Sequence, residues 1–359
     1  MFQVRRRILA KNITAAGQQV VLIDSPSNLY YYTGFTGGEG MFVFSVAEEM
    51  QGYLITDSRY YEQVEKECPD VELVRLENSS YSKIVKQLLS ECTYEKIAVE
   101  KTMNLSQYLN LVEVCPNYSF EINSEAIMNG RMVKDEKELQ RIAKAESIGD
   151  MAFMHILQFL KPGVSEMDIA LELEFYMKKQ GASKLSFDTI IASGANSSMP
   201  HAQVTNRKIQ LGDFVTMDFG CVYQGYCSDM TRTVAVGEPT DEMKKIYQIV
   251  LAANQRALEG ICEGVSCKDI DALARNYIRE QGYSEYFGHG LGHGVGLEIH
   301  EEPRFSPKCN EILRENMVIT DEPGIYLPGK FGVRIEDLVV VKKAGYEILS
   351  NSSKELIIL

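Results

Sequence analysis

A glycine-rich stretch carries most of the histidines of this 359-residue chain. The segment 288–303 reads GHGLGHGVGLEIHEEP and holds three of the five histidines, His289, His293 and His300. The glycines let the backbone turn tightly and approach a ligand, and alternation over 297–300 predicts a short strand after them. Clustered imidazoles favour metal binding or proton transfer. A glycine-rich turn with solvated histidines would give the same composition, so residues elsewhere must decide.

Four carboxylates occur in two segments with the pattern of β-hairpins. Asp218 and Asp229 lie in DFVTMDFGCVYQGYCSDMTRTVAV, and Glu322 and Glu336 lie in NMVITDEPGIYLPGKFGVRIEDLVVV. β-Branched and aromatic residues around glycine-containing turns are typical of hairpins. Each predicted hairpin therefore carries one acid on each of its two strands.

The predicted turns would place the two acids of each hairpin opposite each other. A turn centred on Tyr223 and Gln224 pairs Asp218 with Asp229, and a loop over 328–330 does the same for the two glutamates. Opposed like charges destabilise a sheet, and burying them without partners costs far more. Two divalent cations would neutralise the four charges, with His293 as a nitrogen ligand.

The expected ligands also limit the metal. Carboxylate oxygens with one imidazole and no thiolate suit Mn²⁺, Co²⁺, Fe²⁺ or Zn²⁺. Two such ions about 3.5–4 Å apart can turn a water into a nucleophile near neutral pH. A structural metal site, or a site for a single ion, is the alternative.

A repeated helical segment precedes each hairpin. Residues 161–181, KPGVSEMDIALELEFYMKKQG, align without a gap with residues 262–282, CEGVSCKDIDALARNYIREQG. Ser165 and Ser266 occupy the expected N-cap positions, and each segment ends in the glycine typical of a helix C-terminus. We therefore predict two duplicated halves related by a pseudo-twofold axis.

The rest of the chain predicts an α/β domain at 1–124 and a boundary near 123–130, before a second domain at 130–359. Strands are predicted at 20–23, 41–46, 52–56, 71–76, 97–99 and 119–122. Helices are predicted from a cap at Asp57 or Ser58 through Lys66, and near 81–90 and 105–114. A long amphipathic helix begins near Arg131 and ends before Pro162 and Gly163.

Composition excludes several classes of protein. The formal net charge of −13 argues against nucleic-acid or anionic-membrane partners. The eight cysteines are scattered without a CxxC pair, which favours reduced thiols. The apolar run after the arginines at 5–7 is too short for a secretion signal, and no apolar run approaches the roughly 20 residues that span a bilayer. We expect a cytoplasmic protein.

Together these motifs resemble the metallopeptidase family of creatinase, prolidase and methionine aminopeptidase. The matching motifs are MDFG, SDMTRT, GHGVGLEIHEEP, EPGIY and GVRIED. The resemblance covers the chain from about residue 130 onward and implies the family's pita-bread fold. The N-terminal domain, with YYYTGFTG, resembles that of the Xaa-Pro members, prolidase and aminopeptidase P. A homodimer is also what the resemblance implies.

The resemblance also implies a dinuclear centre, with Mn²⁺ as the first expectation and Co²⁺, Zn²⁺ or Fe²⁺ as alternatives. Its five ligands would be Asp218, Asp229, His293, Glu322 and Glu336. Two of them, Asp229 and Glu336, would contact both ions. Glu322 would also be the carboxylate that transfers a proton.

The same resemblance gives roles to three further histidines. His201 and His300 would hold the substrate carbonyl and stabilise its developing charge. His201 lies in the polar segment SSMPHAQVTNR, where an ordinary surface histidine is the alternative. His289 would lie beside the substrate channel.

Two arginines complete the expected site. Arg334 lies two residues before Glu336, on the same strand face, and could pair with Asp218 in support of the catalytic carboxylates. Arg304 directly follows HEEP, where some prolidases place an arginine that binds the free carboxylate of a dipeptide. Such a contact would reject longer peptides.

We therefore expect an Xaa-Pro dipeptidase, which hydrolyses the bond before proline in proline-containing dipeptides. An Xaa-Pro aminopeptidase acting on longer peptides is the alternative. A metal-independent creatinase-like hydrolase or a non-catalytic relative would show substitutions among the five ligand positions, and none is substituted.

Overall fold

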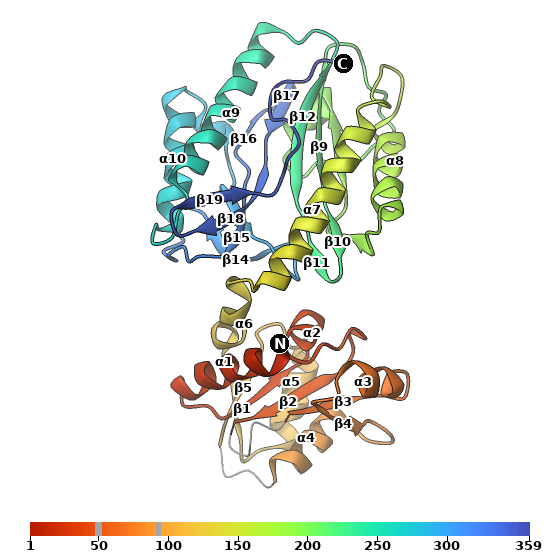
Figure 1. The fold of residues 1–359 in the computed structure, drawn as a ribbon, viewed down its shortest axis with the longest axis vertical. Helices are drawn as coiled ribbons and strands as arrows, with labels where there is room; N and C mark the ends of the chain where they lie inside the picture. The colour runs from red at the N-terminus through yellow and green to blue at the C-terminus, as the bar shows by residue number, and fades with distance from the viewer. Residues whose placement is uncertain (47–51, 91–94) are drawn as a thin grey trace. The chain divides into compact units, whose positions relative to one another are not determined.

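The chain forms two units, Met1–Arg131 and Met132–Leu359 (Figure 1). The computed structural model describes residues 1–46, 52–90 and 95–359. The predicted boundary at 123–130 falls within a helix, α6 (Ser124–Met132). Within the described residues, no helix has the length and apolar character needed to cross a membrane.

The first unit contains a six-stranded mixed sheet among its described residues, in the order β4-β3-β2-β1-β5-β6. Its strands are β1 (Val20–Ile23), β2 (Met41–Ser45), β3 (Gly52–Thr56), β4 (Glu72–Arg75), β5 (Lys96–Val99) and β6 (Ser119–Ile122). Its helices are α1 (Phe2–Ala15), α2 (Pro26–Thr33), α3 (Tyr61–Glu67), α4 (Tyr81–Leu89), α5 (Leu105–Val114) and α6. The central strand β1 is buried along its whole length, as its run of apolar residues predicts.

Two predictions in this unit need comment. The hairpin of β2 and β3 is present, but its connection at 47–51 lies outside the described residues. Helix α3 begins later than predicted, with Tyr60 at the N-cap. The Asp57 carboxylate accepts instead from the backbone and side-chain N–H groups of Arg59, which forms a local turn before the helix.

The second unit places its strands between two pairs of helices, α7 with α8 and α9 with α10 (Figure 1). The helices are α7 (Glu136–Ile156), α8 (Glu166–Lys179), α9 (Asp241–Gly260) and α10 (Cys267–Glu280), with short 3₁₀ turns at Gly194–Ser198 and Ser284–Tyr286. The strands of the first half are β7 (Lys184–Leu185), β8 (Ile190–Ser193), β9 (Asp213–Phe219), β10 (Cys221–Tyr223), β11 (Tyr226–Cys227) and β12 (Met230–Val236). Those of the second half are β13 (Gly292–Gly294), β14 (Glu301–Phe305), β15 (Val318–Asp321), β16 (Gly324–Leu327), β17 (Phe331–Arg334), β18 (Asp337–Lys342) and β19 (Gly345–Ile348).

Helix α7 is shorter than the predicted amphipathic helix. The chain leaves the helical conformation between Met132 and Glu136, so α6 and α7 are separate helices. Asp135 explains the new start, because its side chain accepts from the N–H groups of Lys137 and Glu138 in a capping box. The apolar side of α7 packs with α8 against β8, β9 and β12 in one hydrophobic core.

The predicted duplication is visible in backbone hydrogen bonds. Before α8, Gly163 N donates to Ile209 O at 2.9 Å; before α10, Gly264 N donates to Leu313 O at 2.8 Å. In both halves, therefore, the residues just before the helix form an equivalent backbone hydrogen bond to a segment farther along the chain. The two halves each build a core of their own from a helix pair and the strands beneath it.

The two repeated helices are capped differently. Ser165 forms a capping box with Asp168 at the start of α8. Ser266 lies at the N-cap of α10, as predicted, but its side chain makes no capping hydrogen bond. Both helices end as predicted before a left-handed glycine, Gly181 at φ +104° and Gly282 at φ +88°.

This difference predicts unequal effects of the same substitution. Ser165→Ala should lower the local stability of α8 by about 1 kcal/mol, because the first turn loses its capping hydrogen bonds. Ser266→Ala is the matched control and should change the stability of α10 by only a few tenths of a kcal/mol. Amide hydrogen exchange in the first turn of each helix measures both. Equal protection changes in the two helices would contradict the assignment of the caps.

Candidate active site

The first hairpin brings Asp218 and Asp229 to one face, in a register shifted from the predicted one. Strands β9 and β12 pair antiparallel with Asp218 opposite Thr231. The turn falls at Gln224 and Gly225, which both have positive φ values of 48° and 89° and so suit a tight two-residue hairpin. Asp229 is therefore a diagonal neighbour of Asp218 on the same face. The prediction that these two acids lie directly opposite is wrong.

The second hairpin has the predicted register. Gly324 pairs with Arg334 in the ladder of β16 and β17, and Asp321 pairs with Asp337 in that of β15 and β18. Glu322 and Glu336 lie between these ladders, on opposite arms of the hairpin. The loop at 328–330 connects β16 to β17 as the sequence predicted.

His293 lies in β13, which pairs with both β14 and β15. This strand precedes the segment 297–300, where the alternation predicted a strand and the chain instead bends. The flanking glycines are needed for close packing, because a Cβ on Gly292 would meet Thr320 O at 1.9 Å. This close approach brings the His293 strand directly against the strand that leads to Glu322.

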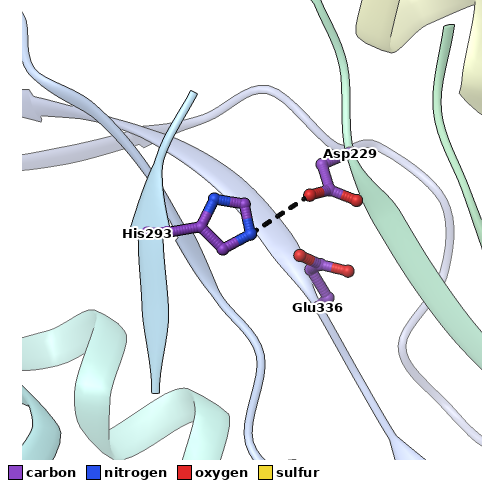
Figure 2. Close-up of side chains that lie close together, drawn as sticks. All are labelled: Asp229, His293 and Glu336. Atoms are coloured by element: carbon purple, nitrogen blue, oxygen red, sulfur yellow. Dashed lines mark ion pairs between the residues drawn. The ribbon is translucent and has the colours of Figure 1, made fainter. Parts of the chain in front are cut away.

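Three of the expected ligands form a buried cluster (Figure 2). One ligand atom each from Asp229, His293 and Glu336 lies within 4.8 Å of the other two. His293 Nε2 lies 3.5 Å from Asp229 Oδ2 and 3.4 Å from Glu322 Oε1. His293 Nδ1 lies 3.1 Å from the Gly294 carbonyl and can donate to it, which leaves the Nε2 lone pair directed at the acids.

Asp218 borders the same cluster and holds one oxygen without a partner. Its Oδ2 accepts from Arg334 Nη2 at 2.6 Å, the ion pair that the sequence predicted. Its Oδ1 is buried and has no hydrogen-bond partner within the described part of the chain. A bound cation would satisfy that oxygen, because a buried carboxylate oxygen without a partner is costly.

The electrostatics of the cluster also fit a cation. Burial, followed by repulsion from Glu336, Asp218 and Glu322, raises the pKa of Asp229 well above its usual value. The pKa of Glu336 is raised in the same way, and that of Glu322 rises to about 8, chiefly through burial. Burial and the neighbouring charges of His300 and Arg304 lower the pKa of His293 to about 3, so that it is a neutral ligand near neutral pH. Oxygen donors with one neutral imidazole suit a divalent ion.

A cavity of about 930 Å³ opens beside these acids. The remaining expected site residues all line it: His201, His289, His300, Arg304 and Arg334. His300 is exposed in the cavity and its ring meets that of His293 edge-to-face at 4.4 Å. His201 is also exposed. The structure thus gathers every predicted site residue around one cavity.

Arg334 forms a chain of contacts that the sequence did not reveal. Its Nη1 donates to the Tyr326 hydroxyl at 2.8 Å, and that hydroxyl lies 3.0 Å from His289 Nε2. His289 Nδ1 lies 2.8 Å from the Gly290 carbonyl, and burial lowers the pKa of this histidine to about 4. The neutral ring can therefore accept from Tyr326. Asp218 is thereby connected to a histidine on the cavity wall.

Two threonines were also missed, and both support the acids. Thr231 Oγ1 donates to Glu336 Oε2 at 2.7 Å and accepts from Arg334 Nε at 3.1 Å. Thr320 Oγ1 donates to Glu322 Oε1 at 3.2 Å. The sequence spacing could have revealed both threonines. Each lies two residues from one of the acids, and residues two apart in a strand share a face.

Comparison with known proteins agrees with this geometry. The model of metallopeptidase family M24 matches residues 140–343. The chain belongs to this family. The Creatinase/Prolidase N-terminal domain matches residues 5–133, so the chain combines an α/β creatinase-type domain with an M24 catalytic domain. M24 peptidases depend on metal, and the buried Asp229, His293 and Glu336 cluster is a candidate for the metal site.

Relatives that match over nearly their whole length are named for two different activities, Xaa-Pro dipeptidase and X-Pro aminopeptidase. An Xaa-Pro dipeptidase of Pyrococcus horikoshii is 40% identical over 94% of this chain and 94% of its own length. The structure of an Xaa-Pro dipeptidase from Bacillus anthracis covers 100% of both chains with a TM-score of 0.96 at 42% identity. The structure of an X-Pro aminopeptidase from Thermotoga maritima covers 97% of this chain and 100% of its own, with a TM-score of 0.88 at 38% identity. The chain is a prolidase-like metallopeptidase.

The acid cluster predicts a pH dependence of the metal-free protein. A carboxyl whose pKa is higher in the folded chain keeps its proton there after the unfolded chain has lost it, so stability falls as pH rises. For Glu322 this loss runs from its ordinary pKa of 4.5 to about 8. The thermal midpoint of metal-stripped protein should therefore fall between about pH 5.5 and about pH 8, and Mn²⁺ should restore it at the higher pH.

Glu336→Gln supplies the control for this measurement, because it removes one negative charge from the cluster. Its metal-free form should lose less stability over the same pH interval, and Mn²⁺ should raise its midpoint less. A pH slope that neither Mn²⁺ nor Glu336→Gln changes would show that the cluster is not the source.

Proposed function

We propose that this protein is an Xaa-Pro dipeptidase that holds two divalent metal ions. The observation that carries the proposal is that Arg304 lines the cavity and its guanidinium has no partner among the described residues. The side chain is partly buried, and its guanidinium has no hydrogen bond or ion pair within residues 1–46, 52–90 and 95–359. A guanidinium in that setting is suited to a carboxylate from outside the chain.

Arg304 is also close enough to act on the acid cluster. Its charge contributes to the lowered pKa values of His293 and His300, and it partly offsets the raised pKa of Glu322. A ligand carboxylate on Arg304 would therefore lie near the expected metal centre. In an Xaa-Pro dipeptide the free carboxylate lies one residue from the scissile bond, which suits such a short separation.

In this proposal Asp218, Asp229, His293, Glu322 and Glu336 would hold the two ions. Divalent ions supply a water of lowered pKa and polarise the substrate carbonyl. Mn²⁺ is the proposed metal because oxygen ligands dominate the set. The partnerless oxygen of Asp218 supports its assignment as a ligand.

The chain's own groups account for binding and proton transfer. Glu322 is mostly buried beside His293, and it would be the carboxylate that takes up and releases the proton. His201 and His300 are exposed in the cavity and can donate to the carbonyl oxygen of the bond before proline. Arg334 orients Asp218, and Tyr326 connects it to His289 on the cavity wall.

An Xaa-Pro aminopeptidase is the second candidate function. The similarity to the Thermotoga maritima X-Pro aminopeptidase structure is nearly as high as that to the dipeptidases. Such an enzyme must accept peptides that continue beyond proline, whose carboxylates would lie too far away for Arg304. Peptide length therefore separates the two functions.

The decisive experiment compares Ala-Pro with Ala-Pro-Ala after the metal has been stripped and Mn²⁺ or Co²⁺ restored. Ala-Pro should be hydrolysed, and Ala-Pro-Ala should be cleaved far more slowly. Arg304→Ala should raise KM for Ala-Pro on the order of 10- to 100-fold, the loss expected for a hydrogen bond to a charged group. Lys308→Ala, at an exposed position just after β14, the strand that carries Arg304, is the matched control. Comparable rates on both peptides would establish the aminopeptidase instead.

A second experiment tests the proton-transfer carboxylate. Glu322→Ala should lower kcat on the order of 10²- to 10⁴-fold, because no other group would transfer the proton. Metal content must be measured in the same sample, since Glu322 is also a proposed ligand. Turnover close to that of the unaltered protein, with metal bound, would rule out the proposed role.

A further inference from the structure

A buried carboxylate outside the cavity accepts hydrogen bonds from the backbone of Asp229 and from the side chain of Ser350. Glu146 lies in the middle of α7 and is 1% exposed. Its Oε2 accepts from the backbone N–H of Asp229 at 3.2 Å. Its Oε1 accepts from the Ser350 hydroxyl at 2.5 Å. None of the roles assigned above uses this residue.

The contact with Asp229 meets a specific local need. Asp229 lies just before β12, outside the ladder that begins at Met230, so no strand partner accepts its N–H. A buried N–H without an acceptor is costly and leaves the backbone free to rotate. Glu146 supplies the acceptor and so restrains the residue whose side chain enters the metal cluster.

The contact with Ser350 extends the restraint to the second half. The Ser350 hydroxyl donates to Glu146 and accepts from the N–H of Leu338 at 2.9 Å. Leu338 lies in β18, two residues after Glu336. One carboxylate thus connects the backbone at Asp229 to the backbone beside Glu336, although these acids come from different hairpins.

We propose that Glu146 is a positioning residue of the metal centre. It restrains Asp229 directly, and Glu336 through Ser350 and Leu338, in the arrangement in which both carboxylates would hold metal. This inference rests on the metal centre of the proposed function. Groups that orient metal ligands from behind usually contribute on the order of 10- to 100-fold to metal affinity.

A second acid on the same helix provides a matched control. Asp150 follows Glu146 by one helical turn and accepts from the backbone N–H groups of Asn351 and Ser352 at 2.7–3.0 Å. It therefore anchors the same C-terminal segment to α7. Unlike Glu146, it makes no hydrogen bond to Asp229 or to β18 within the described residues.

The test measures Mn²⁺ affinity by calorimetric titration of metal-stripped full-length protein, alongside the thermal midpoint without metal. Glu146→Leu fills the space without an acceptor and should weaken Mn²⁺ binding on the order of 10- to 100-fold. Glu146→Gln keeps an oxygen for the Asp229 N–H and should stay within a few-fold of the unaltered protein. Asp150→Ala should leave the affinity unchanged even where it lowers the midpoint.

The outcomes separate this inference from the proposed function. Unchanged affinity in Glu146→Leu, with tight binding by the unaltered protein, would overturn the positioning role alone. Equal losses in Glu146→Leu and Glu146→Gln would also overturn it, because charge rather than hydrogen bonding would then matter. If the unaltered protein bound no divalent metal, the proposed function and this inference would both fail.

Should Glu146→Leu not fold, Ser350→Ala provides the same test with a smaller change. This substitution removes the hydrogen bonds of the Ser350 hydroxyl to Glu146 and from Leu338 N–H, and it leaves the bond from Asp229 N–H to Glu146 in place. It should therefore weaken Mn²⁺ binding by less than Glu146→Leu does. Affinity equal to that of the unaltered protein would overturn the inference.

Discussion

The mutual repulsion of four acids at the junction of two hairpins is the constraint on which the rest of the structure depends. Asp218, Asp229, Glu322 and Glu336 lie close together, and burial, followed by their mutual repulsion, raises the pKa values of the last three. Such a cluster persists only when the surrounding structure prevents it from separating. Apolar strand residues from both hairpins, completely buried in two cores, provide that resistance. Arg334 offsets part of the charge, and a cation would offset the remainder.

The duplication explains how the chain brings these acids together. Each half contributes one helix pair, one hairpin and two of the acids, and the two halves use the same backbone hydrogen bonds before α8 and α10. The two halves also differ in detail. The glycine–histidine strand belongs only to the second half, and the capping box of α8 has no equivalent at α10.

The sequence predicted the acids and their shared faces well, because strand periodicity and turn residues are local. The register of the second hairpin followed from the loop at 328–330, whereas the first was shifted because Gln224, a non-glycine residue, takes the positive φ of the turn. Contacts between distant segments could not be read in the same way. Glu146 resembles any other acid on an amphipathic helix, and only the tertiary structure places it against Asp229. Tyr326 likewise stood out only once Arg334 was seen to contact it.

The origin of the ligands in separate hairpins has a consequence for how the chain acquires its native state. Asp229 and Glu336 are joined only when long-range pairing is complete, and such pairing is the slow part of folding. A preformed metal site rarely exists before that point. The four acids must therefore come together during folding before a metal ion can bind to them. Until then, protonation of the carboxylates is what reduces their mutual repulsion. In the proposed metal centre, loading with metal would therefore replace protons that the buried acids hold.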